Sequence, residues 1–203
     1  MNRISSKAPR ALGLVRMGRL DETAVHVVAA NLQTVLDIPV DILDAMDLPS
    51  YSLLNRRQQH DAGLILKHLS QQAFLDRYLK LVALTDADIS IPILTYVFGE
   101  AEVGGGVALV SGFRLRQREG GMLVPLDTYY ERLAKVALHE VAHTLSLYHC
   151  EDSSCLMHFC PKPADLDLVQ ILFCRRCRFM IRQSIREIRK DAALLESVRF
   201  RPF

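Results

Sequence analysis

The stretch His139-Glu140-Val141-Ala142-His143, followed by His149, is the part of this sequence that decides its fold and chemistry. It places three imidazoles and one carboxylate within eleven residues. In a helix, residues four apart differ by about 40° in projection, so the side chains of His139 and His143 share one face. Two imidazoles on one face can bind the same metal ion, and Glu140 lies about 100° round the helix from His139. The stretch therefore predicts a helix that carries a metal site.

His149 cannot belong to that helical face. It lies six residues beyond His143, which corresponds to about 600°, or about 240° in projection, so a continuous helix would direct it away from the metal. We therefore expect the helix to end near residue 146 and the chain to turn back. Such a turn favours a left-handed residue, usually glycine, and Ser146 at this position costs about 1 kcal/mol relative to glycine.

The three histidines and the glutamate together fit the chemistry of a catalytic zinc. Such a zinc has three protein ligands, here His139, His143 and His149, and leaves one position for water. The metal lowers the pKa of that water from about 15.7 to about 7. Glu140 is placed to accept the proton as the water attacks a peptide carbonyl, and to pass it on to the leaving amine. Because His-Glu-x-x-His is a signature of zinc-dependent hydrolases, we predict hydrolysis.

All five cysteines lie in one short segment, between Cys150 and Cys177. In a reducing compartment, such clustering favours metal thiolates over disulfides. Cys150 and Cys155 form one pair, and about twenty residues later Cys174 and Cys177 form a C-x₂-C pair. This spacing fits a structural zinc site with four cysteine ligands. Cys160 is left over, and we expect it to be a free, partly buried thiol.

The remainder of the chain mixes predicted strands and helices. Extended segments are predicted at residues 11–16, 38–43, 50–55, 78–85, 92–98 and 107–115, and helices at 22–36, 58–75, 127–145, 164–173 and 175–197. Pro39 indicates an edge strand, and Asp127 is expected to cap the metal-binding helix. The glycines of residues 99–106 predict a turn without the Gly-Lys-Ser/Thr ending of a phosphate loop. The predicted class is α/β in the loose sense or α+β.

Composition and charge restrict the possible partners. The 203 residues are 50% hydrophobic and 24% charged, which fits one globular domain or two tightly joined subdomains. The net charge of +2 is too small to indicate general binding to nucleic acid or membranes. There is no apolar run of the roughly 18 residues that a membrane helix needs, and residues 1–10 precede no apolar signal segment. We therefore expect a cytoplasmic protein without membrane or nucleic-acid partners; we also expect it to be a monomer.

Taken together, these motifs resemble those of the archaemetzincins (archaelysins), zinc metalloproteases of the metzincin clan. The family pattern is HExxHxxGxxHCx₄CxM followed by CxxC, and residues 139–177 match it except that Ser146 replaces the glycine. This signature covers about a fifth of the chain and is highly specific. Residues 98–101 and 107–115 also resemble the family's segment before the active-site helix.

The resemblance implies a fold and a domain organisation. The fold is expected to be α+β and metzincin-like: a zincin fold with a twisted mixed sheet, an active-site helix, and a small C-terminal helical subdomain that carries a Cys₄ zinc site. Residues 1–203 are expected to form a single catalytic domain, with an N-terminal subdomain at about 1–149 and a C-terminal subdomain at about 150–203. Residues 107–115 would be a sheet edge above the cleft, where a peptide adds as an extra strand.

The resemblance also implies two zinc ions per chain. The catalytic ion would have His139, His143 and His149 as ligands, and the structural ion Cys150, Cys155, Cys174 and Cys177. Met157 would form the methionine turn, an apolar floor beneath the catalytic histidines. Phe159 occupies the position at which some metzincins have a tyrosine, so no hydroxyl is available there.

Three functions remain open at the level of sequence. The first is a zinc peptidase that acts on peptides or proteins, as an aminopeptidase or an endopeptidase. The second is a non-catalytic module of the same fold that keeps its zinc sites and binds peptides or a protein. The third is nucleic-acid binding through the cysteine site and the basic C-terminal residues, which leaves the three histidines unexplained. Glu140 favours the peptidase, because a binding module needs no carboxylate beside the metal.

Overall fold

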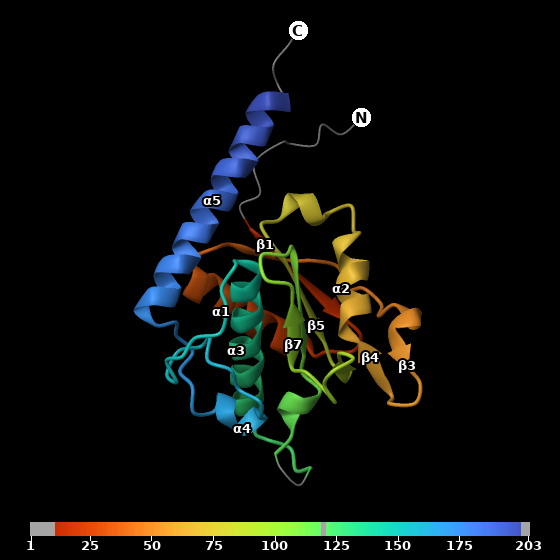
Figure 1. Ribbon diagram of the computed structural model, residues 1–203. Coiled ribbons are helices and arrows are strands. Elements are labelled where there is room, and N and C mark those ends of the chain that lie inside the picture. Colours follow the sequence, from red (N-terminus) through yellow and green to blue (C-terminus); the bar gives the residue numbers. More distant parts are fainter. Residues whose placement is uncertain (1–10, 119–120, 200–203) are drawn as a thin grey trace.

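The computed structural model describes residues 11–118 and 121–199, and only the main chain for residues 192–199. The expectation for residues 1–10 therefore lies outside the described residues. In the described part, a mixed sheet has helices on both faces, and a long C-terminal helix runs along one side of the molecule (Figure 1). This arrangement confirms the predicted mixed α+β fold. Over these residues, no helix is both long and apolar enough to cross a membrane.

The central sheet has the order β2-β1-β5-β8-β7 among the described residues. Its strands are β1 (Leu12–Met17), β2 (Val40–Ile42), β5 (Leu81–Thr85), β7 (Gly99–Ala101) and β8 (Val107–Ser111). The pairs β2-β1, β1-β5 and β5-β8 are parallel, whereas β7 and β8 are antiparallel. Three predicted strands, at 11–16, 38–43 and 78–85, are confirmed with shifted or shorter bounds, and the strand after Pro39 is an edge strand as expected.

The prediction was wrong at the opposite edge of the sheet. We expected residues 107–115 to form the edge, but β8 ends at Ser111 and is covered by β7. Residues 114–116 form a short 3₁₀ turn instead. Strand β7 lies in the glycine-rich segment for which we predicted a turn, because hydrogen bonds from β8 hold its main chain extended whatever its side chains are. A peptide that adds to the sheet at this edge must therefore pair with β7 and not with β8.

Several weaker predictions were wrong in extent. The strand predicted at 50–55 is replaced by the 3₁₀ helix η1 (Ser50–Ser52) and the short strand β3 (Leu53–Leu54). A small second sheet is formed by β3 with β4 (Gln59–Asp61) and β6 (Ile89–Ser90). Helix α2 is shorter than predicted and spans Ala62–Ser70, because the Asp61 side chain accepts a hydrogen bond from the Leu64 N–H and caps it there. Residues 92–95 form turns and bends, with Ile93 91% exposed.

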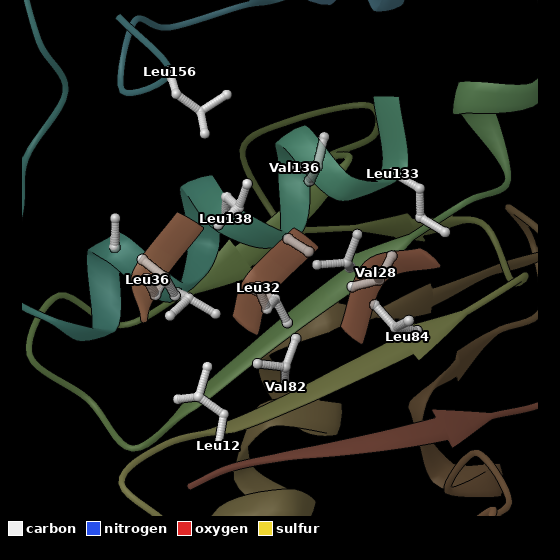
Figure 2. Packing of buried hydrophobic residues seen from close by; sticks show 14 of the residues in the cluster. Leu12, Val28, Leu32, Leu36, Val82, Leu84, Leu133, Val136, Leu138 and Leu156 are labelled. Carbon is white, nitrogen blue, oxygen red and sulfur yellow. The ribbon is translucent and has the colours of Figure 1, made fainter. Parts of the chain in front are cut away.

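Two apolar clusters pack on the two faces of the central sheet. Val82 and Leu84 of β5 face helices α1 (Glu22–Leu36) and α3 (Leu126–Thr144), as Figure 2 shows for their contacts near Val28 and Leu32. The alternating residues of the same strand pack with α2 on the other face. Because strand side chains alternate between faces, the inner strands β1, β5 and β8 are buried on both sides, as their mostly apolar sequences require.

Helix α3 runs through the larger cluster and carries the metal motif. It begins after Pro125, so the predicted N-cap at Asp127 was wrong, although Asp127 does place an acid in the first turn. Polar side chains bind it to the segment that contains α4 (Pro163–Leu166): Arg132 forms an ion pair with Asp167 at 2.6 Å, and the buried Lys135 ammonium donates to the Leu166 carbonyl at 2.7 Å.

The C-terminal residues complete the fold. The prediction of a helix at 164–173 was too long, because α4 is a single turn and residues 167–174 are irregular. The last helix, α5 (Arg175–Arg199), begins where predicted. It buries Cys177, Ile181 and Ile185 in the same cluster as α3, and its later turns extend beyond the sheet (Figure 1).

Candidate active site

The turn that follows helix α3 has the geometry that the sequence predicts. Ser146 has φ = 68°, in the left-handed region. Its N–H donates to the His143 carbonyl at 2.9 Å, and the Leu147 N–H donates to the Ala142 carbonyl at 3.1 Å, which together form a Schellman motif. The turn brings the His149 ring to 4.9 Å from the His143 ring. The left-handed Ser146 is therefore what returns the third histidine to the helix.

Replacement of Ser146 by glycine is expected to stabilise the protein. Glycine has no Cβ to strain the left-handed conformation, and its greater freedom in the unfolded chain offsets part of the gain, which leaves about 0.5–1 kcal/mol. For a chain of this size the melting temperature should rise by about 1–4 °C. Thermal unfolding of Ser146→Gly, with Ser146→Ala as the control that keeps the Cβ, measures this. A lower melting temperature for the glycine variant than for the alanine variant would contradict the argument.

The three histidines form a cluster in which ring nitrogens lie within 4.8 Å of one another. The Nδ1 atoms of His139 and His143 lie 2.8 Å and 2.7 Å from the carbonyl oxygens of Leu156 and Leu147. A carbonyl oxygen only accepts, so each Nδ1 carries the hydrogen and each Nε2 of the neutral ring presents a lone pair. The two Nε2 atoms are 3.0 Å apart.

This arrangement fits a zinc ion. Two unprotonated nitrogen atoms 3.0 Å apart repel each other through their lone pairs unless a cation lies between them. A tetrahedral zinc with zinc–nitrogen bonds of about 2.05 Å holds its nitrogen ligands about 3.3 Å apart, close to this distance. Burial lowers the pKa of His139 to about 4, and also lowers the pKa of His143 and of His149. The rings are therefore neutral at pH 7, which is the form that ligates metal.

Glu140 lies in the cleft beside these rings and is 8% exposed. Its side chain packs against Gly99 of β7, where an added Cβ would come within 2.6 Å of the Glu140 Oε1. Among the described residues it has no hydrogen-bond or ion-pair partner. Burial, and then the negative charge of Glu100, raise the pKa of Glu140 well above its ordinary value. The carboxylate therefore has a high affinity for a proton.

We use the name active-site cleft for the cavity of about 550 Å³ in front of Glu140 and the three histidines. One wall is residues 94–101, which include β7, and the other is formed by Leu156 and residues 158–161 with Leu166 and Val169. The walls are largely apolar, and Glu100 and Glu140 are the carboxylates that line the cleft within the described chain. A peptide would thus meet a mostly apolar groove with few charged groups.

Four cysteines form a second cluster, as predicted. The sulfur atoms of Cys150, Cys155, Cys174 and Cys177 lie within 4.8 Å of one another. The Cys150 and Cys174 sulfurs are 3.9 Å apart, close to the distance of about 3.8 Å between ligands of a tetrahedral zinc with 2.3 Å bonds. All are free thiols, so the cluster fits a metal rather than disulfides. Cys160 is half-buried and is not one of the four.

The two clusters are joined by the loop between Cys150 and Met157. The Cys150 N–H donates to the Met157 carbonyl at 2.8 Å, which closes this loop. Leu156 lies between Cys155 and Met157, and it is the Leu156 carbonyl that orients His139. Met157 is fully buried in the larger apolar cluster. The cysteine cluster therefore helps to position a residue of the histidine cluster.

Sequence reasoning missed three features of this site. It gave no role to the carbonyls of Leu147 and Leu156, because every residue has a carbonyl and no side-chain pattern marks these two. It also gave no role to Gly99, although residues 98–101 resemble a family segment. The carboxylate of Glu100 was likewise not singled out.

Comparisons with known proteins agree with this geometry. The model of peptidase family M54 matches residues 53–183. An archaemetzincin from Methanocaldococcus jannaschii is 36% identical over 137 residues, which are 68% of this chain and 74% of that protein. One from Archaeoglobus fulgidus is 33% identical over 158 residues, which are 78% of this chain and 91% of that protein.

The solved structures that resemble this fold include archaemetzincins as well. The crystal structure of an archaemetzincin from Methanopyrus kandleri matches with a TM-score of 0.77 and 28% sequence identity. The match covers 92% of this chain and 99% of the chain in that structure. The crystal structure of the archaemetzincin from Archaeoglobus fulgidus in complex with malonate matches with a TM-score of 0.72 and 29% sequence identity. The match covers 83% of this chain and 99% of the chain in that structure.

Proposed function

This chain belongs to peptidase family M54, the archaemetzincins, and is a zinc metallopeptidase; from that premise we propose that it hydrolyses peptide bonds with Glu140 as general base. The observation that carries the proposal is the carboxylate of Glu140, which is buried without a partner among the described residues, beside three neutral imidazoles. A non-catalytic binding module has no physical need for such a group.

The proposal includes two zinc ions per chain. His139, His143 and His149 would hold the catalytic zinc, as the opposed lone pairs of two of these rings support. The structural zinc would be held by Cys150, Cys155, Cys174 and Cys177. Met157 would form the methionine turn beneath the histidines, in keeping with its full burial.

In the proposed mechanism, the peptide main chain pairs with the free edge of β7 and places the scissile carbonyl before the histidines. The catalytic zinc, when bound, polarises this carbonyl and lowers the pKa of water. Glu140 accepts a proton from the attacking water, whose oxygen bonds to the carbonyl carbon. Glu140 then donates that proton to the amide nitrogen as the carbon–nitrogen bond breaks, which releases a carboxylic acid and an amine; the acid proton then passes to the amine, giving a carboxylate and an ammonium.

We propose that the whole chain acts as one catalytic domain and as a monomer. The larger apolar cluster supports a single domain, because it includes Leu145 from the part before residue 149 and Phe173 and Ile181 from the part after it. The two parts, at about 1–149 and 150–203, would thus be subdomains that share a core rather than independent units.

Metal removal is the direct test of the proposed function. The wild-type protein is expected to cleave members of a broad peptide library, to lose this activity in the presence of a zinc chelator, and to regain it when zinc is added. Mass spectrometry of the products identifies the cleaved bonds. If the zinc-loaded wild type binds peptides but cleaves none of them, the peptidase proposal fails and a binding module is the better description.

A further inference from the structure

Glu100 is a charged group of the active-site cleft that the proposed mechanism does not use. It lies on β7 and lines the cleft next to Gly99, the residue against which Glu140 packs. It is half-buried, and burial raises the pKa of its carboxyl. Its main chain belongs to the β7-β8 ladder, but within the described chain its carboxylate forms neither a hydrogen bond nor an ion pair.

A half-buried carboxylate without a partner is unfavourable, because it loses hydration without a compensating interaction. Among the described residues that line the cleft, Lys135 is the one lysine or arginine, and it is already paired. The Lys135 ammonium, which also lines the cleft, binds the Glu131 carboxylate at 2.6 Å and the Leu166 carbonyl at 2.7 Å. Glu100 and Glu140 are also near enough to repel each other. A positive charge brought by the substrate would relieve both effects.

We propose that Glu100 determines specificity by binding a protonated amine of the substrate. This inference rests on the proposed peptidase function, because a peptide paired with β7 runs alongside Glu100. The amine is either the α-ammonium of a free N-terminus or the ε-ammonium of a lysine side chain.

The position of Glu100 restricts where this amine lies. The Glu100 Cα is about 3.8 Å from that of Gly99, where β7 contacts the general base. Successive strand side chains point to opposite faces, so the Glu100 side chain lies on the sheet face of its paired residue Leu109, and Gly99 on the face of Glu140. The amine that Glu100 binds therefore belongs to a substrate residue close in sequence to the hydrolysed bond. If Glu100 binds the α-ammonium, the substrate's N-terminus lies in the cleft, and the enzyme removes residues from that end of the peptide. A lysine side chain would permit internal cleavage.

Matched substrates can test the assignment. The zinc-loaded wild type is assayed on pairs that differ only in charge: peptides with free or acetylated N-termini, and peptides with lysine or the isosteric norleucine near the cleaved bond. We expect kcat/KM to favour the cationic member of one pair by about 10- to 100-fold, the range of a charge-assisted hydrogen bond. Glu100→Gln should abolish this ratio. Because the ratio is taken within one enzyme, any effect of Glu100 on the basicity of Glu140 cancels.

Glu102→Gln is the control, because Glu102 is an exposed carboxylate just after β7 that does not line the cleft. It should keep the wild-type ratio. Thermal unfolding of Glu100→Gln should show no loss of stability, since the substitution removes a half-buried charge that has no partner. The pair whose ratio collapses identifies the amine: the acetylation pair the N-terminus, the norleucine pair a lysine. An equal ratio in wild type and Glu100→Gln would overturn the assignment.

Binding distinguishes failure of this inference from failure of the proposed function. The same peptide pairs are titrated into Glu140→Gln, with and without Glu100→Gln, and the dissociation constants are measured. A preference for the cationic peptide that depends on Glu100 supports the assignment even if no peptide is cleaved. If peptides are cleaved but no such preference exists in binding or turnover, the peptidase stands and the role of Glu100 is wrong.

Discussion

Glu140→Gln is expected to lower kcat/KM for peptide hydrolysis by about 10²- to 10⁴-fold, the usual contribution of a general base. Glutamine has nearly the shape of glutamate, so it should fit against Gly99, where the space is limited. It cannot accept the proton of the attacking water. The ligands His139, His143 and His149 are unchanged, and the variant should retain both zinc ions.

Three measurements on the same preparation test this expectation: peptide cleavage, zinc content per chain, and thermal unfolding. The melting temperature should not fall, because the substitution replaces a buried carboxylate that has no partner among the described residues. Glu102→Gln, at an exposed site, is the matched control and should keep full activity. A Glu140→Gln protein that cleaves at the wild-type rate would show that another group is the base.

Cys174→Ala is expected to release one zinc ion and to destabilise the protein strongly. Structural zinc sites in small domains contribute about 10–16 kcal/mol of apparent binding free energy, and much of it is folding free energy. Loss of one thiolate should therefore lower the melting temperature by about 10 °C or more. The Cys174 N–H also donates to the Cys155 sulfur at 3.3 Å, which couples the two halves of the cluster.

The same substitution should reduce activity, although Cys174 lies outside the active-site cleft. The loop closed by the Cys150 N–H and the Met157 carbonyl supplies the Leu156 carbonyl that orients His139. When this loop loses its metal, His139 loses a fixed orientation. Metal-ligand supports of this kind typically affect metal affinity or activity by about 10- to 100-fold.

Zinc analysis, thermal unfolding and peptide cleavage together measure these effects. Cys160→Ala is the matched control for zinc content and thermal unfolding, because Cys160 is a half-buried cysteine outside the four-sulfur cluster. It should retain two zinc ions per chain and nearly the wild-type melting temperature. If the melting curve of Cys174→Ala coincides with that of the wild type, the assignment of a structural zinc to the four cysteines is wrong.

Local patterns were sufficient to predict the elements that carry the chemistry. The spacing of His139 and His143 predicts a helix with one metal-binding face, and the position of His149 requires a turn near Ser146; both features are present. The apolar periodicity of residues 22–36 likewise predicts α1 with its observed bounds. These features depend on residues a few positions apart, so the sequence contains the information that decides them.

Weaker local signals led to wrong bounds. The helix predicted at 58–75 is limited by the Asp61 cap and by pairing of residues 59–61 in a small sheet, and the segment at 92–98 contains turns and bends instead of a strand. Short elements of this kind are decided by which distant segment is available for hydrogen bonding. A single stretch of sequence does not specify that partner.

The sequence by itself determined which side chains are available: three imidazoles, four clustered thiols, and Glu140 beside the first metal ligand. Only the tertiary structure decided that β7 is a sheet edge, that Gly99 makes room for Glu140, and that Glu100 is one of the residues that line the cleft. It alone also selected the carbonyl of Leu156 to orient His139. The physical reason is that main-chain hydrogen-bonding groups are the same in every residue. Their partners are therefore chosen by the packing of segments far apart in the chain.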